Sequence, residues 1–158
     1  MSDGDSCRLK YFEGEPEVLA EGRQMWDEIF DDPEEFADYY FTEICKQNKI
    51  LLAYKGDVLA GMIHLNPYEM QVEGKKELCY YIVGVAVKPE YREQGIMHKM
   101  MQRVLADMKK DGRAFAFLMP EREEYYESLG FEKVFHTLEL DIDIAELEDE
   151  NVVPDELS

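Results

Sequence analysis

Apolar residues change their spacing at the centre of the chain. Residues 81–87 (YIVGVAV) form a short apolar run rich in β-branched side chains, which is typical of a buried strand. After a polar turn with one glycine, apolar residues recur with helical spacing, at Ile96, Met97, Met100, Met101, Val104, Leu105 and Met108. This pattern predicts a buried strand that leads through a glycine turn into an amphipathic helix ending near residues 111–112.

The first eighty residues predict a strand, two helices and a hairpin. We expect a short strand at residues 8–12 and a helix from about residue 18 to the acidic Asp-Pro stop at 31–33. In the second helix, Asp32 is the expected N-cap and Pro33 the first-turn residue. The side chains expected to be buried there are Phe36, Tyr39, Tyr40, Ile44 and Phe41. Residues 50–54 and 58–65 predict a hairpin, and residues 73–76 a second turn into the long central strand.

The last third predicts smaller elements. A strand is expected at residues 114–119, and a charged helix at 121–129 that ends at Gly130. Two closing strands are expected at 131–135 and 137–142. Residues 145–158 are acidic with little to bury, which predicts a mobile tail after a single domain at 1–144.

Composition excludes several classes of protein. No apolar run reaches membrane-spanning length and the first residues are acidic, so we expect a cytoplasmic protein. Three widely spaced cysteines without a Cys-x-x-Cys pair argue against a disulfide framework and a zinc site. The histidines His64, His98 and His136 do not form a ligand set either, so no metal is expected.

The net charge of −19 comes from the two ends. Residues 1–40 hold thirteen acidic and three basic side chains, whereas residues 139–158 hold nine acidic and no basic ones. Such a field repels nucleic acid and anionic membranes, so neither is expected as a partner. Two interpretations stay open: simple solubility, or attraction of an amine or polycationic substrate. A homodimer is one option for the oligomeric state.

The glycine turn at residues 90–95 suggests a site for phosphate. A strand that turns directly into a helix aims several unpaired N–H groups and the positive helix end at one point, an arrangement that binds anions. The two common nucleotide loops, Gly-x-Gly-x-x-Gly and Gly-x-x-x-x-Gly-Lys-Ser/Thr, are absent from the sequence.

Two motifs resemble a known family. The spacing Arg92-x-x-Gly95-x-Met97 resembles the pyrophosphate loop of the GCN5-related N-acetyltransferases (GNAT), and residues 125–131 (YYESLGF) resemble their Tyr-x-x-x-Gly-Phe segment. The resemblance covers about residues 8–142 and implies an α/β (α+β) fold, with a mixed, mostly antiparallel sheet flanked by helices. Residues 64–68, 83–92 and 118–120 look like the N-terminal domain of enhanced-intracellular-survival-type acetyltransferases.

The resemblance implies acetyl-CoA as acyl donor and assigns roles to several residues. Main-chain groups of Val85, Ala86 and Val87 would meet the pantetheine arm and thioester. The pyrophosphate would be held by the residues of the loop and first helical turn, which are Arg92, Glu93, Gln94, Gly95, Ile96, Met97 and His98.

Two residues need separate comment. Met97 stands where the family has Gly or Ala, and we expect its side chain to point into the hydrophobic face of the helix. Tyr126 is the expected proton donor to the coenzyme A thiolate, whereas its neighbour Tyr125 is expected to pack. A phenol can supply this proton because its ordinary pKa is about 10.

The general base is not identified by the sequence. Tyr81 stands where histone-acetylating relatives carry a glutamate. His64 has a suitable ordinary pKa, but a lone histidine on a strand is more often packed. A water relay to an acid such as Glu77, or an amine that arrives deprotonated, are the remaining options.

These observations favour an acetyl-CoA-dependent N-acetyltransferase acting on a primary amine of a small or cationic acceptor. Two alternatives stay open: an acyl-CoA-binding sensor or interaction module with little catalysis, and a protein or peptide N-acetyltransferase. The resemblance implies that the first helices and loops, about residues 13–48, select the acceptor. These residues contain no recognisable motif, so the sequence does not identify the amine.

Overall fold

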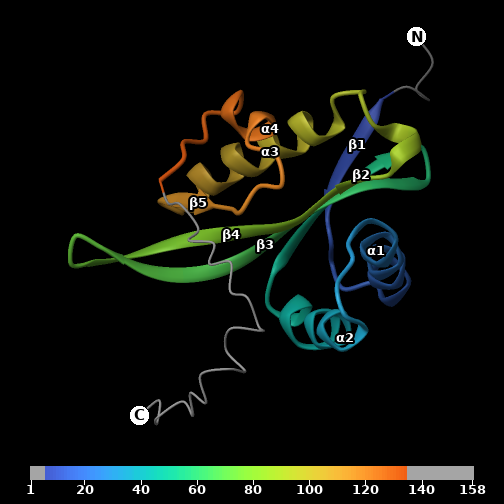
Figure 1. The fold of residues 1–158 in the computed structure, drawn as a ribbon, viewed down its shortest axis with the longest axis horizontal. Coiled ribbons are helices and arrows are strands. Elements are labelled where there is room, and N and C mark those ends of the chain that lie inside the picture. Colours follow the sequence, from blue (N-terminus) through green and yellow to red (C-terminus); the bar gives the residue numbers. More distant parts are fainter. Residues whose placement is uncertain (1–5, 135–158) are drawn as a thin grey trace, which may run out of the picture.

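The computed structural model describes residues 6–134 as a five-stranded sheet with helices on both faces (Figure 1). Its strands lie in the order β1-β2-β3-β4-β5, all neighbours antiparallel except β4 and β5. The elements are β1 (Cys7–Tyr11), α1 (Pro16–Ile29), α2 (Glu34–Glu43), the 3-10 turn η2 (Ile44–Lys46), β2 (Lys49–Lys55), β3 (Val58–Val72), β4 (Lys75–Val87), the 3-10 turn η3 (Pro89–Tyr91), α3 (Ile96–Lys110), β5 (Phe115–Phe117) and α4 (Glu124–Glu127). The predicted mixed α/β architecture is confirmed.

Alternation along the strands separates two hydrophobic cores. In β2, Leu51 and Ala53 face α3, whereas Ile50 and Leu52 face α1 and α2, as the period of two requires. The predicted stripe of α3 fills the first core, with the buried side chains Ile96, Met100, Met101, Val104 and Met108. Figure 1 shows α3 on one side of the sheet and α1 with α2 on the other.

A bulge interrupts β4 opposite the centre of β3. Met62 pairs with Ala86 but His64 pairs with Val83, so two steps along β3 correspond to three along β4. Gly84 lies in this bulge with φ +58°, a left-handed backbone that favours glycine. At the bulge β4 contacts α1, where the ring of Trp26 lies against Gly84.

Several expected details of the helices are wrong. Asp32 does not cap α2; its carboxylate accepts a hydrogen bond from Trp26 Nε1 at 2.9 Å. Phe36 and Tyr39 are exposed because α2 turns Ala37, Tyr40 and Phe41 toward the core instead. Only one face of this ten-residue helix can pack on the sheet, so Phe36 and Tyr39 on the other face stay outside the core.

The end of the described chain also differs from expectation. α4 spans four residues instead of nine, and residues 131–134 form no strand. Gly130 does follow the last turn with φ +89°. The second closing strand, His136 and the acidic tail lie outside the described residues.

Candidate active site

β4 and β5 separate after three paired residues. Their parallel pairing runs from Cys79–Phe115 to Tyr81–Phe117, while β4 continues to Val87. Within residues 6–134, the β5-facing edge of β4 therefore has no strand partner beyond Tyr81. An extended ligand with amide groups can bond to such an edge as an added strand would. Val85, Ala86 and Val87 lie on this segment.

The turn between β4 and α3 presents a helix N-terminus to solvent. Gly95 adopts φ +77°, and residues 92–95 are exposed. Lys99 N–H bonds to Gly95 O at 3.0 Å, so the amides of Ile96, Met97 and His98 precede the first helical hydrogen bond. The predicted glycine turn is therefore present, with these amides at the start of α3.

Arg92 links this turn to the open strand. Its Nε donates to Val87 O at 3.0 Å, which places the guanidinium at the junction of β4 and the loop. A Cβ built on Gly95 would meet no heavy atom within 4 Å, so the space above this glycine is open. The structure thus brings the strand end, the arginine and the helix start together.

Met97 and Tyr125 do not lie as the sequence suggested. Met97 is half-buried and is a member of neither core cluster among the described residues, so the core position expected for it is wrong. Tyr125 is 52% exposed, with its ring beside Arg122. The packing residue is Tyr126, which lies against the α3-side core and Phe131.

Tyr126 keeps its phenolic proton to high pH. Burial, with a smaller contribution from the charge of Glu121, raises the pKa of Tyr126 above its ordinary value of 10.0. The hydroxyl is thus a proton donor near neutral pH. Tyr126 does not line the cavity described next.

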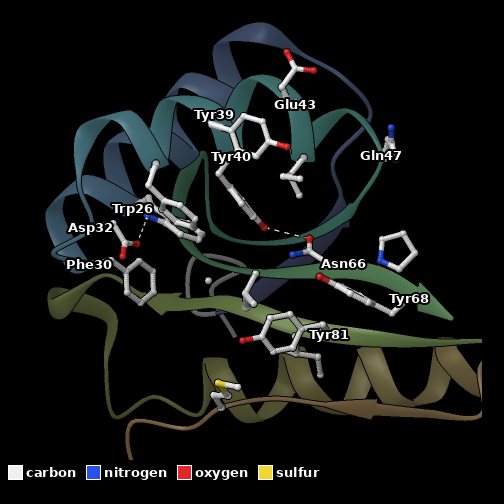
Figure 2. Close-up of a pocket in the computed structure, with 17 residues that line it drawn as sticks. Trp26, Phe30, Asp32, Tyr39, Tyr40, Glu43, Gln47, Asn66, Tyr68 and Tyr81 are labelled. Carbon is white, nitrogen blue, oxygen red and sulfur yellow. Dashed lines mark hydrogen bonds between the residues drawn. The ribbon is translucent and has the colours of Figure 1, made fainter. Parts of the chain in front are cut away.

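A cavity of about 1070 Å³ lies between α1–α2 and the strands β3–β4 (Figure 2). We call it the aromatic cavity. In Figure 2, Tyr39 and Glu43 of α2 lie above it, and Tyr68 of β3 and Tyr81 of β4 lie below it. The bulge residues Val83 and Gly84 also line it, so the cavity reaches the point where β4 leaves β5. The unpaired edge of β4 and the aromatic cavity therefore lie next to each other along the same strand.

A buried polar network joins α2 to β3 at the cavity wall. The Tyr40 hydroxyl donates to Asn66 Oδ1 at 3.2 Å and lies 3.1 Å from His64 Nδ1. Asn48 Nδ2 donates to Tyr40 Oη and to Asn66 Oδ1, at 3.2 and 3.0 Å. Burial raises the pKa of Tyr40 well above its ordinary value, so the phenol stays neutral. The network fixes the wall instead of supplying a reactive group.

His64 belongs to that wall and is no base. It is fully buried among Trp26, Tyr40 and Phe41, and burial lowers its pKa to about 3. The interpretation of His64 as a packed histidine is confirmed. A group with so low a pKa stays unprotonated but accepts a proton weakly at neutral pH.

The cavity contains two carboxylates, and neither was expected there. Asp32 and Glu43 line it, whereas Glu77 lies four residues before Tyr81 and is not a lining residue. Glu43 pairs with Lys46 at 3.4 Å. Asp32 has no basic partner among the described residues. Asp32 was expected to cap α2 because an Asp-Pro pair is a common signal for a helix start. The pair gives no sign that the carboxylate would instead accept a hydrogen bond from Trp26.

Aromatic side chains form the floor below these acids. Tyr81 stacks on Phe117 of β5 with ring centroids 4.8 Å apart and 16° between planes. Tyr68 meets both rings edge-on, at 6.0 and 5.9 Å. Tyr81, the residue that stands in the sequence where histone-acetylating relatives are expected to carry a glutamate, thus presents an aromatic ring to the cavity. The alternation of β3 and β4 could have identified Tyr68 as its neighbour.

The comparisons with known proteins agree with this geometry. A family model described as an acetyltransferase (GNAT) domain matches residues 15–134. The chain belongs to the GNAT acetyltransferase family. A search of curated proteins found no match.

Solved structures share the GNAT fold at low sequence identity. A probable N-acyltransferase of unknown function from Enterococcus faecalis V583 has a TM-score of 0.73 at 22% identity, over 80% of this chain and 32% of that chain. This chain thus spans about a third of the Enterococcus protein. A predicted acetyltransferase from Clostridium acetobutylicum, solved with acetyl-CoA, has a TM-score of 0.66 at 17% identity, over 93% and 100% of the two chains.

A third similar structure carries an analogue of both substrates. AAC(6')-Iy in complex with the bisubstrate analogue CoA-S-monomethyl-acetylneamine has a TM-score of 0.68 at 15% identity, covering 86% of this chain and 99% of that one. At such identities the likeness shows the fold. Within residues 6–134, no helix is long and apolar enough to cross a membrane, and no cluster of three potential ligands is placed to hold a metal ion.

Proposed function

We propose that this GNAT protein is an acetyl-CoA-dependent N-acetyltransferase that acetylates a primary amine of a small or cationic acceptor. The observation that carries the proposal is the position of the β4 bulge. On the sheet edge, β4 is open toward the start of α3. On the sheet face, Val83 and Gly84 line a cavity with two carboxylates. Donor and acceptor can therefore meet at one strand from two sides.

The chain's own groups fit the acyl donor. The amides at the start of α3 and Arg92 suit a pyrophosphate, because they combine N–H donors with positive charge. The open edge of β4 suits the amide-bearing pantetheine arm. The main-chain amide of Met97 precedes the first helical hydrogen bond and can donate to phosphate.

Acetyl transfer from the thioester to the amine forms an amide bond and releases a thiol. In our proposal, main-chain N–H groups of β4 near the bulge orient the thioester carbonyl, where negative charge develops. The phenol of Tyr126 gives its proton to the departing sulfur and recovers one from solvent. Asp32 and Glu43 attract the cationic acceptor into the cavity.

A finer relation to the survival-type enzymes is part of this proposal. The chain matches about a third of the Enterococcus probable N-acyltransferase, which agrees with an N-acyltransferase domain that also occurs within longer proteins. The stretches at residues 64–68, 83–92 and 118–120 support that relation. Aminoglycosides, which some survival-type enzymes accept, belong on the first substrate panel for this reason.

The test is calorimetric titration with acetyl-CoA, followed by thiol release against a panel of amines. We expect binding of acetyl-CoA and turnover of at least one primary amine. Binding without turnover of any amine would favour the acyl-CoA sensor. Absence of binding would contradict the proposed donor site.

A further inference from the structure

The aromatic cavity has an unusual lining for a site that takes hydrophilic amines. Seven of its 17 lining residues are aromatic and two are carboxylates, and none is Lys, Arg or His. The other polar lining side chains are Gln47, Asn66 and the hydroxyls of the tyrosines, and Asn66 already bonds to Tyr40 and Asn48. Such a surface matches a ligand that combines aromatic rings with a positive charge.

Three of the aromatic side chains in the lining are exposed. Phe36, Tyr39 and Tyr68 are 49%, 58% and 48% exposed, and all line this cavity. Large apolar side chains that gather at one hollow mark a binding surface, whereas single exposed ones are ordinary. They come from α2 and β3, on opposite sides of the cavity, so a flat molecule can lie between them (Figure 2).

Asp32 supplies the charge at a fixed position. Its Oδ2 accepts the 2.9 Å hydrogen bond from Trp26 Nε1, and the ring of Trp26 lies against Gly84 in the β4 bulge. The carboxylate is therefore held about one indole ring away from the strand where transfer is proposed. Glu43 already pairs with Lys46, whereas Asp32 has no basic partner among the described residues, so Asp32 is the lining acid better placed to pair with a ligand cation.

We propose that the acceptor is a monocationic amine carried on a flat apolar body of one or two rings, such as an arylalkylamine. Its ammonium lies near Asp32 and its rings lie between the α2 aromatics and Tyr68. That the bound amine is then acetylated rests on the proposed acetyltransferase function. The ammonium loses one proton to solvent, nitrogen bonds to the acetyl carbon as the carbon–sulfur bond breaks, and a second proton ends on sulfur. The product amide is neutral, so it loses its attraction to Asp32 and leaves.

Binding is measured by calorimetry in the presence of coenzyme A, so that no turnover occurs. Tryptamine is compared with tryptophol, which keeps the rings but is neutral, and with glucosamine, which keeps the ammonium on a polyhydroxylated ring. We expect tryptamine to bind at least about tenfold more tightly than either, because it satisfies both charge and rings. Equal or tighter binding of glucosamine, or equal binding of tryptophol, would overturn the proposal.

Matched variants separate charge from ring contacts. We expect Asp32→Asn to weaken tryptamine about tenfold and leave tryptophol unchanged, because the amide still accepts from Trp26 but has no charge. Asp31→Asn removes an equal charge from an exposed neighbour outside the cavity and should change neither. Phe36→Ala should weaken both ligands, whereas Leu78→Ala, 45% exposed elsewhere, should weaken neither. An unchanged affinity in Asp32→Asn and Phe36→Ala would also overturn the proposal.

Thiol release with tryptamine distinguishes the two proposals. The predicted binding pattern without turnover of any amine supports the ligand class and contradicts the acetyltransferase. Rapid turnover of glucosamine or a polyamine, with no preference for tryptamine, contradicts the ligand class and supports the acetyltransferase.

Discussion

The indole of Trp26 occupies the space that a side chain at position 84 would need. A Cβ built on Gly84 would lie 2.6 Å from Trp26 Cζ3 and 2.8 Å from His64 Cδ2, closer than such atoms approach. The close approach lets α1 rest on the β4 bulge. The same indole holds Asp32, so the bulge, the helix and the cavity carboxylate form one contact chain.

Gly84→Ala tests this contact chain. We expect it to lower the free energy of unfolding by about 3 kcal/mol or more, because a left-handed backbone and an overpacked side chain both cost energy. Urea unfolding followed by circular dichroism measures the loss. Gly56→Ala is the matched control, since Gly56 has the same φ of +58° but nothing within 4 Å of its Cβ position. It should lose about 1 kcal/mol, from backbone strain alone. Equal losses of unfolding free energy in Gly84→Ala and Gly56→Ala would mean that the contact with Trp26 does not contribute to stability.

Gly95→Asp tests the proposed donor site. A carboxylate at the start of α3 repels a pyrophosphate, so we expect the Kd for coenzyme A to rise at least tenfold. Gly112→Asp controls for the backbone, because Gly112 has φ +70° with open space around it at the far end of α3. It should leave the Kd unchanged. Calorimetric titration of both variants decides, and an unaltered Kd in Gly95→Asp would remove the site from this loop.

Tyr126→Phe tests the proposed acid. We expect kcat to fall by about 10²-fold or more with little change in the melting temperature, because the ring and its packing on Phe131 remain. Since burial raises the pKa of this phenol, the midpoint of any loss of activity from its ionisation should lie above the ordinary value of 10.0. Tyr125→Phe, in the exposed neighbour, should turn over normally. Thiol release across a pH series measures both, and full activity in Tyr126→Phe would exclude the role.

His64 predicts an acid-sensitive fold. Its pKa is 6.5 in the unfolded chain and about 3 in the folded one, so only the unfolded state gains a proton between these values. The stabilisation is complete above pH 6.5 and is lost as pH falls, by up to about 1.4 kcal/mol per pH unit. Between pH 6.5 and 5, the wild type should therefore lose about 2 kcal/mol more than His64→Gln.

Urea unfolding at several pH values measures that difference. The comparison cancels the titration of the many carboxylates, which both proteins share. His98→Gln changes an exposed histidine and should follow the wild type. A His64→Gln variant with the wild-type pH dependence would show that His64 is not buried neutral.

The elements with strong periodicity were predicted well. The α3 stripe, the β2–β3 hairpin turn and the strand-to-helix glycine turn follow from local spacing, and all three are confirmed. The bulge at Gly84 was not predicted, because it depends on register against β3 and leaves the apolar run unchanged. α4 was predicted too long, since a charged helix with one apolar side has little local signal for its ends.

The two halves of the site differ in the same way. The proposed donor segment is contiguous in sequence and contains a helix-start signal, so residues 85–98 could be proposed from the sequence alone. The cavity half joins α2, β3 and β4 across separate parts of the chain. Phe36 and Tyr39 were therefore read as core and Asp32 as a cap, because spacing within one helix cannot tell a core from a cavity.

The two faces of α2 carry different constraints on change. Ala37, Tyr40 and Phe41 are committed to the core, and Tyr40 is bonded into the wall. Phe36, Tyr39 and Glu43 face the cavity and contribute little to the core. Substitutions at these three positions should therefore change what the cavity binds more than they change the stability of the fold. The same ten-residue helix thus anchors the fold with one face and lines the ligand cavity with the other.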